Sequence, residues 1–166
     1  MIEAICFDLG DTLVAEETVI HNSCGQAITA KVVKGAFEVI RSLSRLGYKV
    51  AIIANDEDGV SARNVINDTG LKDYFNTILI SGELGIEKPD SRIFEVALKS
   101  LGVKARNAVM VGNRIDADIV GANRIGMKSV WFKWNNRYPA SVNTKEEEPD
   151  FTISNLSDLN AVLGLL

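Results

Sequence analysis

Short, continuously apolar runs alternate with amphipathic segments along most of the chain. Five runs have the length and composition of β-strands, and they cover residues 4–8, 48–54, 77–81, 107–112 and 128–132. Their apolar residues follow one another without regular alternation, which is typical of strands that are buried on both faces. The pattern therefore predicts a sheet that is covered by helices on both sides.

The segments between these runs have the period of amphipathic helices. They cover residues 36–47, 59–70, 90–102 and 116–126, and each ends in a glycine, as helices often do. Asp90 or Ser91 stands where the third helix would have its N-cap. Regular alternation of strand and helix predicts an α/β fold, a doubly wound three-layer sandwich around a mostly parallel sheet.

Polar residues follow four of the predicted strands. Asp8 comes after the first strand, Asn55 and Asp56 after the second, residues 82–88 after the third and residues 113–118 after the fourth. Doubly wound sheets bind ligands at the carboxyl ends of their strands. We therefore expect these side chains to converge on one site, since ordinary turn chemistry does not explain four such strand ends together.

Composition narrows the class of protein. The chain has 166 residues, of which 46% are hydrophobic and 24% charged, and this favours one compact domain over residues 1–166. A net charge of −4 gives no basic field for nucleic acid. No apolar run is long enough for a membrane span and no leader pattern opens the sequence, so we expect a cytoplasmic protein. Cys6, Cys24 and His21 lack the spacing of a metal site.

Four segments in order resemble the motifs of the haloacid dehalogenase superfamily. FDLGDTL resembles the first motif, VAIIAN the second, GIEKPDSRIFEVAL the third, and VMVGNRIDADIVGANRIGM the fourth. The tail PDFTISNLSDLNAVL is similar to the last strand and helix of that superfamily. Each match alone is weak, but together they cover nearly the whole chain.

The resemblance implies a magnesium-dependent phosphohydrolase. Asp8 would attack phosphorus and become an aspartyl phosphate, while Lys88 would screen the repulsion between Asp8 and the incoming anion. The phosphate would be bound by Lys88, Asn55 and the backbone N–H groups of the turn formed by Leu9, Gly10 and Asp11. The implied Mg²⁺ ligands are Asp8, the carbonyl group of Gly10, Asn113 and Asp118.

Three positions depart from the superfamily pattern. Gly10 stands where most members have an aspartate that serves as general acid and base, a function worth about 10²–10⁴ in rate. Ala54 replaces a threonine or serine that donates to the phosphate. Asn113 replaces an aspartate, which weakens the expected magnesium site. We therefore expect slow turnover.

Two further carboxylates have two interpretations each. Asp11 is either a turn residue that bonds its own backbone or a substitute acid and base in a reshaped turn. Asp116 is either a solvated residue at the start of a helix or an additional ligand. The sequence alone favours the structural interpretation for both.

Residues 14–33 are too few for the helical cap that many members insert after the first motif, so we expect only a short flap there. An uncapped site is open to solvent and would be closed by a large phosphorylated substrate or by a neighbouring subunit of a homo-oligomer. The aromatic segment 131–139 is a candidate for such a surface, or else a loose connection. Residues 133–150 are expected to form a mobile loop.

Three other functions compete with the phosphatase hypothesis. A catalytically impaired relative would keep the fold to bind a phosphorylated ligand or a protein partner. A two-component receiver domain also combines an aspartate, a lysine and Mg²⁺, but the Lys-Pro pair and the order of the fourth motif argue against it. Dehalogenase relatives have a bulky aromatic residue at the position of Gly10 and a helical cap, and this chain has neither.

Overall fold

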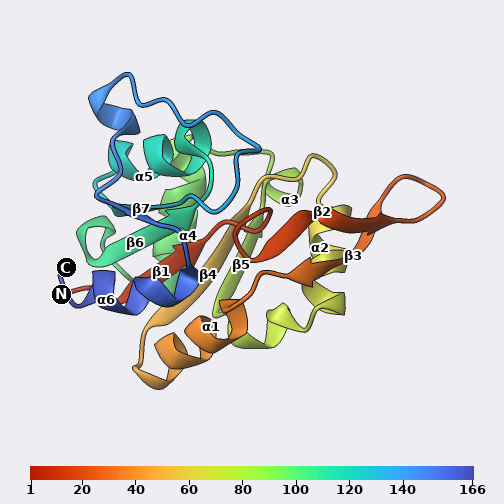
Figure 1. Cartoon of the computed structure of the whole chain (residues 1–166), viewed down its shortest axis with the longest axis horizontal. Coiled ribbons are helices and arrows are strands. Elements are labelled where there is room, and N and C mark those ends of the chain that lie inside the picture. The colour runs from red at the N-terminus through yellow and green to blue at the C-terminus, as the bar shows by residue number, and fades with distance from the viewer.

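A six-stranded parallel sheet forms the centre of the computed structural model, which describes residues 1–166 (Figure 1). Its strand order is β5-β4-β1-β6-β7-β8, and every neighbouring pair is parallel. The strands are β1 (Ala4–Phe7), β4 (Lys49–Ala54), β5 (Thr77–Ile80), β6 (Ala108–Gly112), β7 (Lys128–Phe132) and β8 (Phe151–Ile153).

Helices connect the strands. They are α1 (Ala36–Arg45), α2 (Val60–Asp68), α3 (Ser81–Leu84), α4 (Ser91–Leu101), α5 (Val120–Arg124) and α6 (Leu159–Leu163). Short 3₁₀ turns cover Leu71–Tyr74, Ala105–Asn107, Lys145–Glu147 and Leu156–Asp158, and a π-helical turn covers Ile115–Ile119. None of the helices combines the length and the apolar character that crossing a membrane requires.

Both faces of the sheet are buried. Ile5 and Phe7 of β1 belong to a large apolar cluster with α1, α2 and α6, whereas Ala4 and Cys6 point to the other side, toward α4 and α5. Side chains alternate across a strand, so a continuous apolar run supplies both faces at once. This arrangement confirms the predicted doubly wound α/β sandwich.

The predicted elements agree with the structure to within a few residues, with two differences. The helix expected over residues 116–126 begins instead with the π-helical turn, in which the N–H groups of Asp118 and Ile119 both donate to the carbonyl of Arg114. The expected flap over residues 14–33 is an antiparallel hairpin of β2 (Val14–His21) and β3 (Ala27–Val32), and it projects beyond the sheet (Figure 1).

Helix α2 holds this hairpin in place. The backbone N–H of Ala27 donates to Ser61 Oγ at 3.1 Å, and Asn64 Nδ2 donates to the carbonyl of Ala27 at 3.1 Å. The hairpin is the only excursion between β1 and α1, so no large cap covers the carboxyl end of β1.

Candidate functional site

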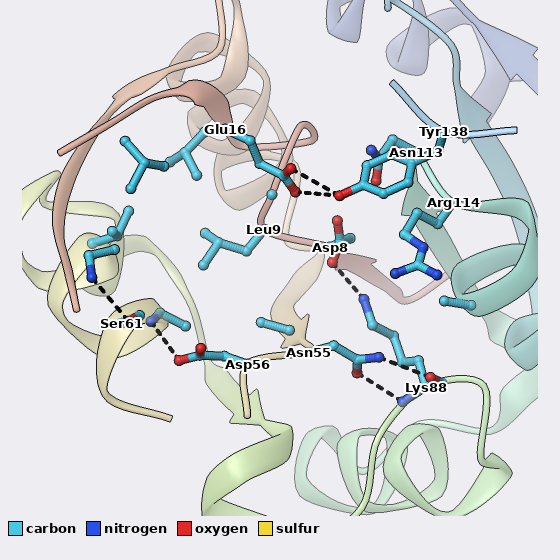
Figure 2. A pocket seen from close by; sticks show the side chains of 18 residues that line it. Asp8, Leu9, Glu16, Asn55, Asp56, Ser61, Lys88, Asn113, Arg114 and Tyr138 are labelled. Atoms are coloured by element: carbon cyan, nitrogen blue, oxygen red, sulfur yellow. Dashed lines mark hydrogen bonds and ion pairs between the residues drawn. The ribbon is translucent and has the colours of Figure 1, made fainter. Parts of the chain in front are cut away.

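A cavity of about 210 Å³ lies at the carboxyl ends of β1, β4 and β6 (Figure 2). The hairpin and α2 form its opposite side. Its polar lining comes from Asp8, Glu16, Asn55, Asp56, Ser61, Lys88, Asn113, Arg114 and Tyr138. The strand ends singled out by the sequence therefore do converge on one site.

Lys88 lies at the centre of a buried charge cluster. Its Nζ donates to Asp8 Oδ1 at 2.6 Å and to Asp118 Oδ1 at 2.7 Å. Only 2% of the Lys88 side chain is exposed, against 12% for Asp8 and 1% for Asp118. Burying charges is costly unless they are paired and hydrogen-bonded, and here two carboxylates surround one ammonium group.

Burial and mutual attraction act in opposite directions on this cluster. Burial alone would lower the pKa of the Lys88 ammonium, but the charges of Asp118 and Asp8 outweigh it and raise that pKa. Burial raises the pKa of Asp118 to about 6, against the opposing attraction of Lys88. Lys88 is therefore a fixed cation next to Asp8.

Asn55, directly after β4, holds the backbone of Lys88. Its Nδ2 donates to the Lys88 carbonyl at 2.9 Å, and its Oδ1 accepts from the Lys88 N–H at 2.9 Å (Figure 2). The sequence analysis predicts that Asn55 binds the phosphate. Its side chain lines the cavity, but its bonds in the structure go to the Lys88 peptide, and its role as a phosphate ligand stays a prediction.

Asp118 is placed by the turn that follows β6. Its Oδ2 accepts from the backbone N–H of Arg114 at 3.0 Å. A Cβ at Gly112 would lie 2.2 Å from that same oxygen. Position 112 therefore has to be glycine if Asp118 is to reach Lys88.

The turn after Asp8 offers free backbone donors. The N–H groups of Leu9 and Gly10 donate to no group within the protein, and both residues line the cavity. The Asp11 N–H, which the sequence placed with them, donates instead to the carbonyl of Val14 at 2.7 Å. Two unpaired N–H groups next to a carboxylate are suited to bind oxygens of an anion.

Asp11 turns away from the cavity. It is fully buried with a φ of 49°, and its Oδ1 accepts from the backbone N–H of Glu16 at 2.9 Å. Its Oδ2 accepts from Arg137 Nε, and Trp134 Nε1 donates to its backbone carbonyl at 2.6 Å. These contacts support the turn-forming interpretation of Asp11 and tie segment 133–139 to the turn. The predicted mobility of residues 133–150 stays a prediction.

Glu16 occupies the space that Gly10 leaves empty. A Cβ at Gly10 would lie 2.4 Å from Glu16 Oε1. Tyr138 Oη donates to both Glu16 oxygens, at 3.1 and 2.9 Å (Figure 2). Burial, the largest influence, raises the pKa of Glu16 even though the bond from Tyr138 lowers it. A second carboxylate thus faces the cavity beside Asp8, but it comes from the hairpin.

Asn113 is the residue whose polar groups lack partners. Its side chain is buried, and neither Oδ1 nor Nδ2 has a hydrogen-bond partner. Buried amides are normally satisfied, so these two atoms are available to an ion or a ligand in the cavity. The Asn113 oxygen and the Asp8 carboxylate are hard oxygen donors of the kind that Mg²⁺ prefers, and the residues present therefore fit that ion. Nowhere do three or more His, Cys, Asp or Glu side chains come together in a group that could hold a metal ion.

Other residues considered from the sequence have simpler positions. Ala54 lines the cavity without any hydroxyl group. Asp116 is exposed and paired with Arg114, so it lies in an ion pair at the rim. Cys6 is buried in the core and Cys24 is exposed.

Sequence reasoning assigned no role to Glu16, Arg114 or Tyr138, although all three line the cavity. Arg114 follows Asn113 within the fourth motif, and Tyr138 belongs to the aromatic segment 131–139, so weak signals existed for both. Glu16 lies in a strand whose exposed and buried positions show no clear pattern. The only feature of the sequence that indicates a role for Glu16 is the glycine at position 10, which leaves room for the Glu16 side chain.

Residues 24–126 match the sequence profile of haloacid dehalogenase-like hydrolases. The chain belongs to this family. It is 37% identical over 131 residues to a glyceraldehyde 3-phosphate phosphatase from Pyrococcus furiosus, over 79% of this chain and 54% of the relative. It is 33% identical over 115 residues to a phosphoserine phosphatase from Thermus thermophilus, over 69% of this chain and 44% of the relative.

The chain spans about half the length of the curated relatives it matches. Solved structures match it along its full length. A crystal structure of an uncharacterized protein from Listeria monocytogenes serotype 4b has a TM-score of 0.76 and 29% identity, covering 99% of this chain and 98% of that one. A HAD phosphatase from Thermococcus onnurineus has a TM-score of 0.79 at 21% identity, covering 98% of both chains. The second likeness shows the fold alone.

Proposed function

We propose that this haloacid dehalogenase-like protein is a magnesium-dependent phosphatase that acts through an aspartyl phosphate on Asp8. The observation that carries the proposal is the position of Asp8 between Lys88, the free N–H groups of Leu9 and Gly10, and the unpartnered Asn113 side chain. A nucleophile, a fixed cation and anion-binding donors thus face one cavity. The relatives with phosphatase names support the same chemistry.

The chemistry follows from these positions. A carboxylate oxygen of Asp8 forms a bond to phosphorus while the bond from phosphorus to the leaving oxygen breaks. Lys88 lowers the repulsion between Asp8 and the phosphoryl oxygens, and the Leu9 and Gly10 N–H groups bind those oxygens. Water then attacks phosphorus, the bond to Asp8 breaks, and inorganic phosphate leaves.

Asp8, the Gly10 carbonyl, Asn113 and Asp118 would hold Mg²⁺, which neutralises negative charge on the phosphoryl group when bound. Both Asp118 oxygens already accept hydrogen bonds, from Lys88 and from Arg114, but each keeps a second lone pair. Gly10 has no proton to give, so the leaving oxygen takes its proton from water. Slow turnover of esters with poor leaving groups follows from this.

The test is hydrolysis of p-nitrophenyl phosphate and a panel of small phosphate esters, with Mg²⁺ and with a chelator. Asp8→Asn should lower kcat at least 10³-fold, and Asp68→Asn should leave kcat unchanged because Asp68 is exposed on α2, away from the cavity. Brief acid quenching with a labelled substrate should retain label on the wild-type chain and none on Asp8→Asn. Equal rates for both variants would exclude Asp8 as nucleophile.

Two specific observations favour a second function. Ala54 faces the cavity without the hydroxyl that the family uses, and Gly10 lacks its carboxylate, so a chain that binds phosphate esters without hydrolysing them is the alternative. Binding of inorganic phosphate with Mg²⁺ but no turnover of any ester would select it. In either case we expect a cytoplasmic protein that takes phosphorylated small molecules. Chromatography at micromolar concentration would test whether a second copy closes the site.

A further inference from the structure

The side of the cavity that faces the leaving group differs in chemistry from the side that faces phosphate. Asp8, Lys88, Asn113 and Arg114 lie together on one side, while Ser61 and Asp56 lie on the other (Figure 2). The hairpin and α2 also contribute five side chains without polar groups to the cavity lining, and we call them the apolar wall: Val14, Val19, Ala27, Ala62 and Val65. A leaving group attached to phosphorus at Asp8 would contact this apolar wall.

The charges near this wall are negative or already neutralised. Glu16 adds a carboxylate that Tyr138 holds in place and that lies 3.6 Å from Arg137, a cation already bonded to the buried Asp11. The two cations that line the cavity are engaged: Lys88 by Asp8 and Asp118, and Arg114 by Asp116. A second anionic group on the substrate would therefore meet a carboxylate and find no unpaired cation.

The N-terminus of α2 does not supply the missing positive field. The first N–H groups of a helix can bind an anion when they have no other partner. Asp58 Oδ1 accepts from the N–H of Val60 at 2.9 Å, and Asp56 Oδ2 accepts from that of Ala62 at 2.8 Å. Two carboxylates thus already satisfy the helix terminus.

The geometry points to a substrate class: phosphate monoesters of small, uncharged and partly apolar alcohols. Glu16 and Val19, both on the hairpin, are the residues that exclude a second anionic group. This inference rests on the proposed function, because that proposal places the phosphoryl group of the substrate at Asp8. The cavity of about 210 Å³ is smaller than typical ligand pockets of about 300–1,000 Å³, which suits a phosphoryl group and a short or single-ring alcohol.

Phosphonates that cannot be hydrolysed test the inference by binding alone. Calorimetry with Mg²⁺ at pH 8 would compare 4-carboxamidophenylphosphonate with 4-carboxyphenylphosphonate, which differ in charge but hardly in size. We expect the carboxamide to bind at least 10-fold more tightly. We also expect phenylphosphonate to bind about 10-fold more tightly than 2-hydroxyethylphosphonate, because the ring contacts the apolar wall.

Amino-acid substitutions test which residues cause the preference for uncharged and apolar phosphonates. Glu16→Gln keeps the shape of the side chain and removes its charge, and should reduce the carboxamide-to-carboxylate ratio to within about threefold. Glu17→Gln is the matched control, since the neighbouring Glu17 is exposed and does not line this cavity. Val19→Thr should reduce the phenyl preference about threefold, whereas Ile20→Thr, on the exposed next residue, should not change it.

Each outcome has a defined meaning. Equal or tighter binding of the carboxylate, an unchanged ratio in Glu16→Gln, or no binding of any phosphonate at millimolar concentration would overturn the inference. Selective binding of the uncharged phosphonates without turnover of any ester would sustain it while the phosphatase proposal fails. Turnover of esters without selectivity among the phosphonates would support the phosphatase proposal and overturn the inference.

Discussion

The two sides of the cavity are built in different ways. On the strand-end side, Asp8, Lys88 and Asp118 are almost completely buried, and Lys88 bonds both carboxylates. On the hairpin side, the Glu16 and Arg137 side chains are about one third exposed and 3.6 Å apart. The first side is fixed by the ends of the sheet strands, whereas the second depends on contacts between the hairpin and segment 133–139. We therefore expect substitutions on the strand-end side to affect stability and chemistry together, and those on the hairpin side to affect stability less and selectivity more.

Among the substitutions that test this difference between the two sides, Lys88→Met should have the largest effect on stability. It leaves two buried carboxylates without their cation, and we expect the free energy of unfolding to fall by about 3–5 kcal/mol in metal-free buffer at pH 8. Burial and the Asp8 charge raise the pKa of Asp118, and Lys88 opposes them, so without Lys88 that pKa rises further above its unfolded value. The loss should therefore be smaller at pH 5 and grow as pH rises. Urea denaturation at the two pH values measures it.

Lys128→Met is the matched control, because Lys128 pairs with Asp150 at 2.7 Å with 45% of its side chain exposed. Exposed pairs contribute about 0–1 kcal/mol, so this variant should unfold near the wild-type midpoint. Equal losses in the two lysine variants would show that the burial of the Lys88 cluster has no energetic consequence.

Arg137→Leu should have a smaller effect on the hairpin side. It removes a partner of the buried Asp11 carboxylate, which then keeps only the Glu16 N–H. Since the Arg137 side chain is 38% exposed, solvent screening should keep the loss well below that of Lys88→Met, as measured by thermal denaturation. Arg106→Leu is the control, since Arg106 is exposed and makes no ion pair or side-chain hydrogen bond. A loss as large as that of Lys88→Met would remove the contrast between the two sides.

The smallest expected effect is on the pH dependence of stability, and it comes from Cys6 on β1, the strand that leads to Asp8. Burial raises the pKa of the Cys6 thiol from 9.0 to about 12. Above pH 9 the unfolded chain loses this proton while the folded chain keeps it, so stability falls as pH rises, by at most about 1.4 kcal/mol per pH unit. Urea midpoints at pH 8, 9 and 10 should fall more steeply for the wild type than for Cys6→Ala. Parallel curves would show that the thiol titrates alike in both states.

The sheet and the strand-end side of the cavity were predictable from the sequence because a few local rules determine them. Continuous apolar runs predict buried parallel strands, and parallel strands bring their carboxyl ends to one edge. Asp8, Asn55, Lys88 and Asn113 each follow a strand or lie in the connection after one, so their convergence follows from topology.

The hairpin side was not predictable in the same way. β2 and β3 have a mixed burial pattern, and their position depends on Ser61 and Asn64 of α2. The Glu16 carboxylate reaches the cavity because Gly10 leaves space and Tyr138 binds it, and neither contact is visible in local sequence. Likewise, the available N–H groups of the first turn are those of Leu9 and Gly10 but not of Asp11, and this depends on a bond to Val14.

The contacts from segment 133–139 to the first turn also have a consequence for biosynthesis. Trp134 and Asp11 are 123 residues apart along the chain, and Tyr138 and Glu16 are 122 apart. At about 5–20 residues per second, a ribosome adds Tyr138 about 6–24 s after Glu16. During that interval the nascent chain carries β1, Asp8 and the hairpin without the aromatic residues that later hold the first turn and the hairpin together.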